Sequence, residues 1–147
     1  MILKTEDRRQ TTENENKELS NNSIRNIKDL KVYCIGYKLA MDIFEISKRF
    51  PKEETYSLTD QIRRSSRSVA MTIREGFAKR RYKQVFIRLL NDALGSSEET
   101  RGWLEFARDC EYIQKFRFHQ LDKKYDTLNA MLYRLMENWE NFSDVTS

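Results

Sequence analysis

The side chains in this sequence that could do chemistry are arginines and lysines, concentrated in one short segment. Between Gln61 and Lys83 there are eight basic residues and one acid, Glu75, so these 23 residues carry a net charge of 8 − 1 = +7. The other 124 residues carry 19 basic and 22 acidic groups, a net charge of −3. A concentrated basic segment in an otherwise balanced chain attracts polyanions such as nucleic acids.

The candidate nucleic-acid-binding residues are the basic members of this segment: Arg63, Arg64, Arg67, Arg74, Lys79, Arg80, Arg81 and Lys83. Arginine suits phosphate because its planar guanidinium group donates hydrogen bonds to two oxygens at once. Tyr82 could add stacking on unpaired bases. The sequence has no helix-turn-helix, zinc-finger or aromatic strand motif that would read bases. We therefore expect contacts with the nucleic-acid backbone, and binding that depends strongly on salt.

Other kinds of chemistry are not indicated. His119 is the single histidine, and Cys34 and Cys110 are isolated from each other and from any metal-ligand spacing. The sequence has no glycine-rich phosphate loop and no Ser or Cys nucleophile motif. We therefore predict a protein that is not an enzyme and that has neither a cofactor nor a metal site.

Composition and hydropathy indicate one helical domain in the cytoplasm. The sequence has one Pro and four Gly, and 34% of its residues are charged, a composition that favours helices over a turn-rich β protein. No apolar run is long enough for a membrane span or a signal peptide. Residues 1–27 and 143–147 are polar, and we predict a disordered tail at each end of a domain that covers residues 28–142.

The spacing of apolar residues predicts four helices. They cover residues 29–50, 57–79, 83–110 and 118–142, and the last shows an alternating three- and four-residue spacing over more than three heptads. Phe50-Pro51 is expected to end the first helix, and Ser57 with Asp60 to cap the second. The apolar spacing continues across Gly95, so the third helix should be unbroken. Short connections between such helices predict an antiparallel up-down four-helix bundle.

The predicted second helix places the basic residues on one side. At 100° per residue, Arg63, Arg67 and Arg74 fall within about 40° of each other. They lie opposite the apolar row that begins with Leu58 and Ile62. We therefore expect an outward basic stripe that continues into the segment from Lys79 to Lys83.

Several blocks of sequence occur in an order that resembles a known family. They are Asp29-Leu30-Lys31-Val32-Tyr33, Phe50-Pro51, Gln61-Ile62-Arg63-Arg64-Ser65, Glu75-Gly76, Leu94-Gly95-Ser96, Glu99-Thr100, Trp103-Leu104-Glu105 and Tyr112-Ile113. Together they resemble the four-helix bundle family of 23S rRNA intervening-sequence proteins. This family includes the accessory variability determinant of diversity-generating retroelements.

The resemblance implies a small cytoplasmic protein that assembles into a homo-oligomeric ring, a homopentamer in its relatives. It implies no enzymatic role and, for retroelement members, binding to nucleic acid and to a reverse transcriptase. The family function expected here is RNA or DNA binding through the basic face of the second helix.

Two other interpretations remain open. In one, the protein is an interaction scaffold whose basic face docks a partner such as a reverse transcriptase, and that partner makes most of the nucleic-acid contacts. In the other, the arginines neutralise acids across the subunit interfaces of an oligomer. The position of Trp103, on a different side of its helix from Leu104 and Thr100, also suggests a subunit interface.

Overall fold

The computed structural model describes residues 24–142. All but the last four residues of the predicted tail at 1–27, and the whole predicted tail at 143–147, lie outside the described residues. Within residues 24–142 the chain forms four α-helices, two short 3-10 helices and no strand. The elements are η1 (Ile27–Asp29), α2 (Lys31–Ser47), η2 (Lys52–Glu54), α3 (Leu58–Ala78), α4 (Lys83–Asp109) and α5 (Lys115–Phe142). The prediction of an all-α chain with four helices is therefore confirmed.

The chain divides into an N-terminal unit that ends at Lys31 and a second unit that begins at Val32. In the first unit, Asn26 caps η1. Its side-chain oxygen accepts a hydrogen bond from the Lys28 amide at 3.2 Å, while Asp29 accepts one from the Asn26 amide at 3.0 Å. Such a reciprocal cap satisfies backbone donors that a short helix would leave free.

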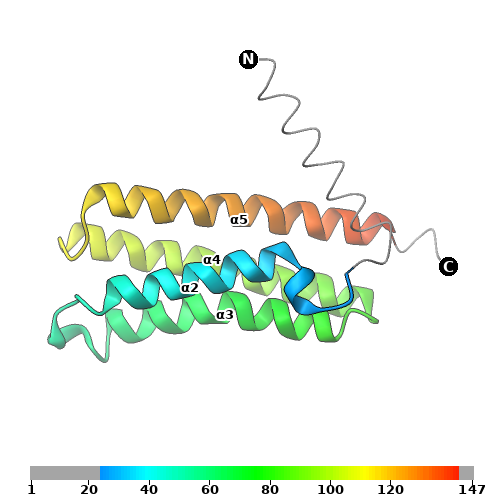
Figure 1. Ribbon diagram of the computed structural model, residues 1–147, viewed down its shortest axis with the longest axis horizontal. Helices are drawn as coiled ribbons and strands as arrows, with labels where there is room; N and C mark the ends of the chain where they lie inside the picture. Colours follow the sequence, from blue (N-terminus) through cyan, green and yellow to red (C-terminus); the bar gives the residue numbers. More distant parts are fainter. Residues whose placement is uncertain (1–23, 143–147) are drawn as a thin grey trace, which may run out of the picture. The chain divides into compact units, whose positions relative to one another are not determined.

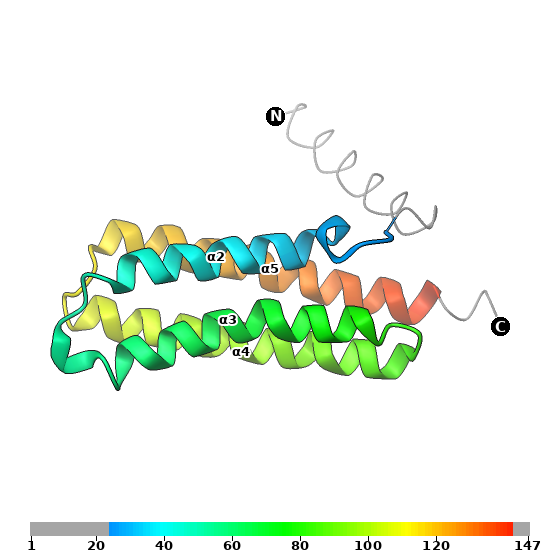
Figure 2. The ribbon, with the colours of Figure 1, turned by 60° about the horizontal axis from the view of Figure 1, so that its bottom comes forward.

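In the second unit the helices lie side by side (Figures 1 and 2). The connections from α2 to α3 and from α4 to α5 lie at one end, and the turn from α3 to α4 lies at the other (Figure 1). Helices α3 and α4 pack against each other along much of their length. Glycine at position 76 permits this packing, because a β-carbon there would lie only 3.0 Å from Leu89 Cβ.

The core of the bundle comes from the apolar rows that the sequence predicts. All the expected inward residues of α4 are buried: Phe86, Leu89, Leu90, Ala93, Ser97, Thr100, Leu104 and Ala107. The residues of α5 from Phe118 to Leu135 in the expected row are also buried, and Trp139 packs edge-on against Phe86 with ring centroids 4.7 Å apart. Helix α4 continues through Gly95 without a break, as expected.

Two local predictions are wrong. Helix α2 ends at Ser47 rather than Phe50, because the amides of Arg49 and Phe50 bond to carbonyls three residues earlier and tighten the chain into a turn. Ser57 precedes α3, but its hydroxyl bonds to Glu54 at 3.0 Å and makes no cap hydrogen bond. The Ser57 backbone, with φ −124° and ψ −104°, lies outside the extended conformation that a capping residue usually adopts.

Buried polar side chains join neighbouring helices inside the bundle. Thr100 donates to the Ser65 hydroxyl at 2.8 Å and so links α4 to α3. Asn129 of α5 accepts a hydrogen bond from Ser97 and donates to Glu98 of α4 at 2.7 Å. Polar pairs of this kind favour one alignment of the helices, because a shifted alignment would leave these groups buried without partners.

Arg101 joins α4 to α5 at the edge of this polar layer. Its Nε donates to one Asp122 oxygen at 2.8 Å and an NH2 group donates to the other at 3.3 Å. The hydrogen bonds and charge of Asp122 raise the pKa of Arg101 above its ordinary value.

We expect Arg101→Lys to lower the free energy of unfolding by about 1–2 kcal/mol, because lysine cannot make the paired hydrogen bonds. Urea denaturation of both proteins measures this loss. An unchanged midpoint would show that the paired hydrogen bonds add nothing to the ion pair with Asp122.

Tyr125 is fully buried, and its hydroxyl has no hydrogen-bond partner within the described part of the chain. Burial raises the pKa of Tyr125 above its ordinary value of 10, and Asp42 adds to this rise. A pKa that is raised in the folded state makes stability fall above about pH 10, where only the unfolded tyrosine ionises.

We therefore expect two effects of Tyr125→Phe. The free energy of unfolding at pH 7 should rise by about 1 kcal/mol, because no unpaired hydroxyl is then buried. The loss of stability between pH 10 and 11 should also be smaller by about 1 kcal/mol. Thermal denaturation at pH 7, 10 and 11 measures both. A variant that is less stable at pH 7 would show that the hydroxyl is satisfied in solution.

Candidate nucleic-acid interface

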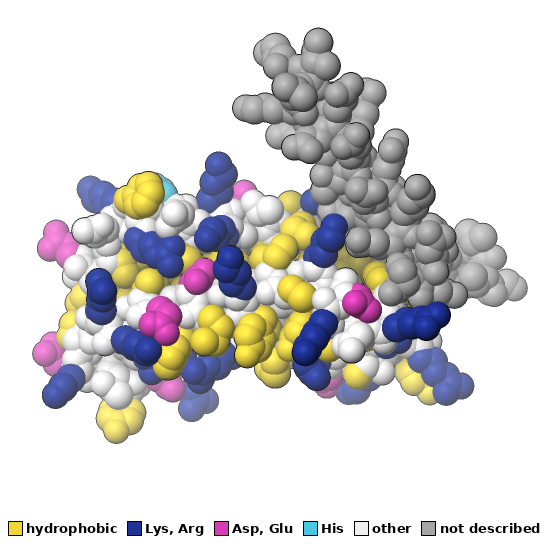
Figure 3. Space-filling model, in the orientation of Figure 1, with side chains coloured by type: hydrophobic (Ala, Val, Ile, Leu, Met, Phe, Trp, Pro, Cys, Tyr) yellow, Lys and Arg dark blue, Asp and Glu magenta, His cyan; other side chains and the backbone are white. Residues whose placement is uncertain are grey.

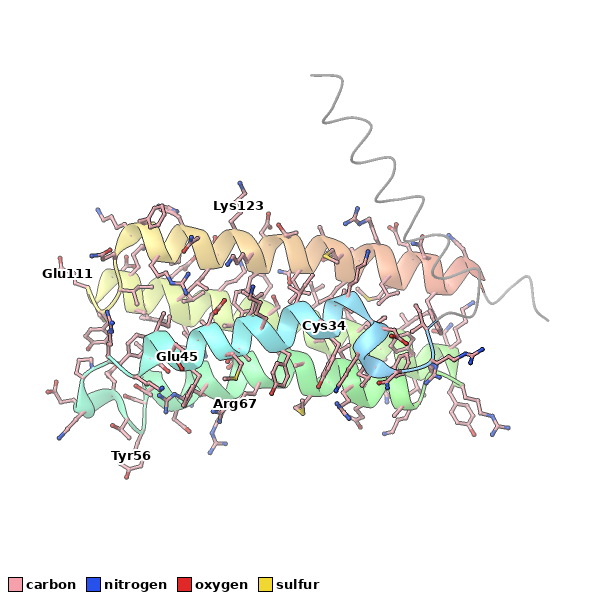
Figure 4. All side chains as sticks on the ribbon, in the orientation of Figure 1. Cys34, Glu45, Tyr56, Arg67, Glu111 and Lys123 are labelled. Carbon is pink, nitrogen blue, oxygen red and sulfur yellow. The ribbon has the colours of Figure 1, made fainter. Side chains whose placement is uncertain are left out.

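Helix α3, the turn after it and the first residue of α4, Lys83, carry all eight candidate residues. The inward face of α3 is apolar or small, with Leu58, Ile62, Val69 and Ile73 buried, so its charged residues lie on the other sides of the helix. Arg67 points away from the bundle on the α3 side (Figure 4) and is exposed, as is Arg74, whereas Arg63 is half-buried.

Three of these arginines lie beside aromatic rings of α2. The guanidinium carbons of Arg63 and Arg67 lie 4.9 and 5.9 Å from the centroid of Phe44. That of Arg74 lies 5.6 Å from the ring of Tyr33. These distances fall within the range of cation–π attraction. We call Arg63, Arg67 and Arg74 the arginine face. The arginine face therefore lies next to α2, and its side chains contact the rings of that helix.

Two hydrogen bonds to α2 hold members of the arginine face in place. Arg63 Nε donates to the Ser47 hydroxyl at 2.8 Å, and Arg74 donates to the Tyr33 hydroxyl at 2.9 Å. Both acceptors are neutral, so the arginines keep their full positive charge while their side chains lose freedom. An arginine that is already ordered loses less entropy when it binds phosphate.

The segment from Lys79 to Lys83, which we call the basic turn, is held by similar contacts. Arg80 lies 3.9 Å from the centroid of Phe77 and donates to the Phe77 carbonyl at 2.9 Å. Arg81 lies 5.9 Å from the ring of Tyr82, which is 63% exposed. Lys83 donates to the backbone carbonyl of Glu140 at 2.6 Å. An exposed tyrosine among cations is suited to stacking on a base.

Carboxylates neutralise few of the candidate residues. Arg64 pairs with Asp60 at 3.0 Å and Lys79 with Glu75 at 2.9 Å, both four residues apart on exposed helix surface. Such pairs contribute only about 0.3–0.5 kcal/mol and exchange easily for phosphate. The remaining arginines have no carboxylate partner within residues 24–142: Arg63, Arg67, Arg74, Arg80 and Arg81.

The described residues hold no group of three or more His, Cys, Asp or Glu side chains that could bind a metal ion. His119 is exposed and packs edge-on against Phe118 at 5.3 Å. Cys34 and Cys110 are both exposed and unbridged. None of the helices described here has the length and apolarity to cross a membrane.

The rings beside the arginines are functional candidates that the sequence interpretation did not select. Tyr33 and Phe44 belong to a second apolar row of the first helix, beside the row that faces the core. That second row could have indicated these rings from the sequence, because a helix that is apolar over such a wide arc is covered by other side chains on more than one side. The arginines of α3 provide it in part. Tyr37, in the same row, remains 51% exposed.

The fold and this surface define an all-α protein with four helices in a bundle and a basic, aromatic-lined face. The family model for the 23S rRNA-intervening sequence protein matches residues 28–134, and the chain therefore belongs to that family. A similar solved structure is a protein of unknown function from the S23 ribosomal protein family of Bacteroides thetaiotaomicron. It is 27% identical, has a TM-score of 0.65, and the match covers 71% of this chain and 97% of that chain. No curated protein matches. The predicted family resemblance is thus confirmed.

Proposed function

We propose that this protein is a non-enzymatic cytoplasmic protein that binds the backbone of RNA or DNA through the arginine face and the basic turn. The observation that carries the proposal is the set of five arginines without carboxylate partners in residues 24–142, each beside an aromatic ring. These arginines are ordered and positively charged without internal neutralisation. The name of the family also connects it with a ribosomal RNA insertion.

The first test is a fluorescence-anisotropy titration with labelled structured RNA and duplex DNA over a salt series. Each phosphate contact contributes a slope of about −0.9 to the dependence of log affinity on log salt for duplex DNA. Several arginine contacts should therefore give a slope of about −3 or steeper. Absence of binding at low salt would refute direct binding and favour docking to a protein partner such as a reverse transcriptase.

The proposal includes self-association of antiparallel up-down bundles into a ring. It is supported by exposed aromatic residues on α4 and the loop before α3. Phe106 is 59% exposed and Tyr56 is 94% exposed, and Trp103 packs against Phe106 with ring centroids 5.7 Å apart. Apolar surface of this kind commonly marks an interface. Light scattering should give a molar mass about five times the chain mass of 17.7 kDa. A mass equal to one chain would refute the ring.

A further inference from the structure

A second basic site lies at the end of α2, away from the basic turn. A cavity of about 630 Å³ lies between the last turn of α2, the connection from α4 to α5, and the beginning of α5. Three of its lining residues are cations: Lys48, Arg49 and Arg117. In the same region, where α2 ends and α5 begins, Lys and Arg side chains lie among hydrophobic ones (Figure 3). The volume suits a ligand the size of one nucleotide.

The charges in this cavity favour an anion. Glu45 is the one acidic lining residue, and Lys48 pairs with it at 3.2 Å. Arg117 donates to the neutral side chain of Gln120 at 2.7 Å. The Arg49 side chain has no hydrogen-bond or ion-pair partner among residues 24–142. Two arginines therefore remain available for a phosphate group, which accepts several hydrogen bonds from guanidinium donors.

The apolar part of the cavity favours a flat ring. Phe116 is 74% exposed at the mouth, although aromatic residues of its size are usually at least partly covered. Tyr112, on the connection from α4 to α5, also lines the cavity and packs against buried Phe50, with ring centroids 5.7 Å apart. An exposed ring next to arginines without carboxylate partners matches the combination that binds an unpaired nucleotide, in which the base stacks and the phosphate accepts hydrogen bonds.

The cavity is continuous with the arginine face. Lys48 lines the cavity, and its Nζ lies 4.7 Å from the centroid of Phe44. Arg63 and Arg67 lie beside the same ring, at 4.9 and 5.9 Å. Phe44 therefore has cations of both the cavity and the arginine face beside it, and a strand whose phosphates follow the arginine face would come within reach of the cavity.

We propose that this cavity holds one unpaired nucleotide of the bound strand, with its base on Phe116 and its phosphate on Arg49 and Arg117. The inference rests on the proposed nucleic-acid binding and adds to it the preferred substrate, a strand with an unpaired nucleotide next to a duplex. The arginine face alone would bind any duplex backbone. The cavity adds a contact that a fully paired duplex cannot make, because its bases remain stacked inside the helix.

The test compares two RNA hairpins that differ by one unpaired 2-aminopurine nucleotide. We expect the wild-type protein to bind the hairpin with the unpaired nucleotide about tenfold more tightly. Its 2-aminopurine fluorescence should be quenched on binding, because the base stacks on a ring. Phe116→Ala should remove both the tenfold preference and the quenching, and Arg49→Ala should reduce the preference. Tyr133→Ala, at an exposed ring of α5 that does not line the cavity, should keep them.

The outcomes separate this inference from the proposed function. Equal binding of the two hairpins by the wild-type protein would overturn the cavity assignment and leave backbone binding intact. Loss of the preference in Tyr133→Ala as well would also overturn it. Failure to bind either hairpin at low salt would overturn both proposals. A further outcome is that free 2-aminopurine nucleoside monophosphate displaces the hairpin when both are at the same concentration. That result would assign the cavity to a free nucleotide and refute the proposal that it holds a nucleotide of a bound strand.

Discussion

The double variant Arg67→Glu with Arg74→Glu should lower affinity for structured RNA and duplex DNA by about a hundredfold at low salt. Both side chains are exposed and neither has a carboxylate partner within the described residues. Each replacement removes a guanidinium group that donates hydrogen bonds to phosphate and puts a negative charge in its place. The dependence of log affinity on log salt should become shallower by about two contacts, a change of roughly 1.8 in slope for duplex DNA.

A matched control separates the position of the charge from its amount. Arg88→Glu with Arg134→Glu also changes the net charge by −4, from +4 to 0, on exposed positions of α4 and α5. We expect this control to keep most of the affinity, because the changes lie outside α3 and the basic turn. Circular dichroism should show unchanged helicity in both variants, since exposed charges contribute little to folding. Equal losses in the two variants would show that net charge, and not the arginine face, drives binding.

Gly76→Leu should lower the free energy of unfolding by about 3 kcal/mol. A β-carbon at this position would lie 3.0 Å from both Leu89 Cβ and Phe86 Cδ2, closer than the ordinary separation of about 3.5–4.0 Å. The leucine side chain would force α3 and α4 apart where they pack against each other. The Tm should fall by roughly 10 °C.

The same substitution at Gly95 is the control. Nothing lies within 4 Å of a β-carbon built there, and Gly95 is an exposed position inside α4. Gly95→Leu should therefore raise the free energy of unfolding by about 0.7 kcal/mol, because leucine favours a helix more than glycine does. Differential scanning calorimetry measures both changes. A stabilised Gly76→Leu variant would contradict the packing of α3 against α4.

The buried rows of α4 and α5 were predictable because each helix carries its pattern within itself. A residue such as Leu90 or Leu132 is assigned to the core by its spacing from neighbours in the same helix. The unbroken course of α4 through Gly95 was predictable for the same reason. Helix ends were less predictable. Ser57 donates its hydroxyl hydrogen to Glu54 and does not cap α3, because its backbone lies outside the extended conformation of a capping residue.

The candidate site was predictable as a set of charges but not as an arrangement. The sequence placed Arg63, Arg67 and Arg74 on one side of a helix, but it could not identify the rings beside them. The rings belong to Tyr33 and Phe44 on another helix. The spacing of residues along one helix shows which of them share a side, but it does not show which other helix packs beside that side. The cavity with Arg49 and Phe116 joins residues from two helices and a connection, so no local pattern marks it.

By itself, then, the sequence determined the number and faces of the helices, the concentration of positive charge, and the family. Those properties follow from periodicity, composition and residue order along the chain. The tertiary structure alone decided which arginines lie beside aromatic rings, which lack carboxylate partners, and where a base could enter. Those properties depend on the packing of helices distant in sequence, where long side chains take partners from whichever element lies within reach.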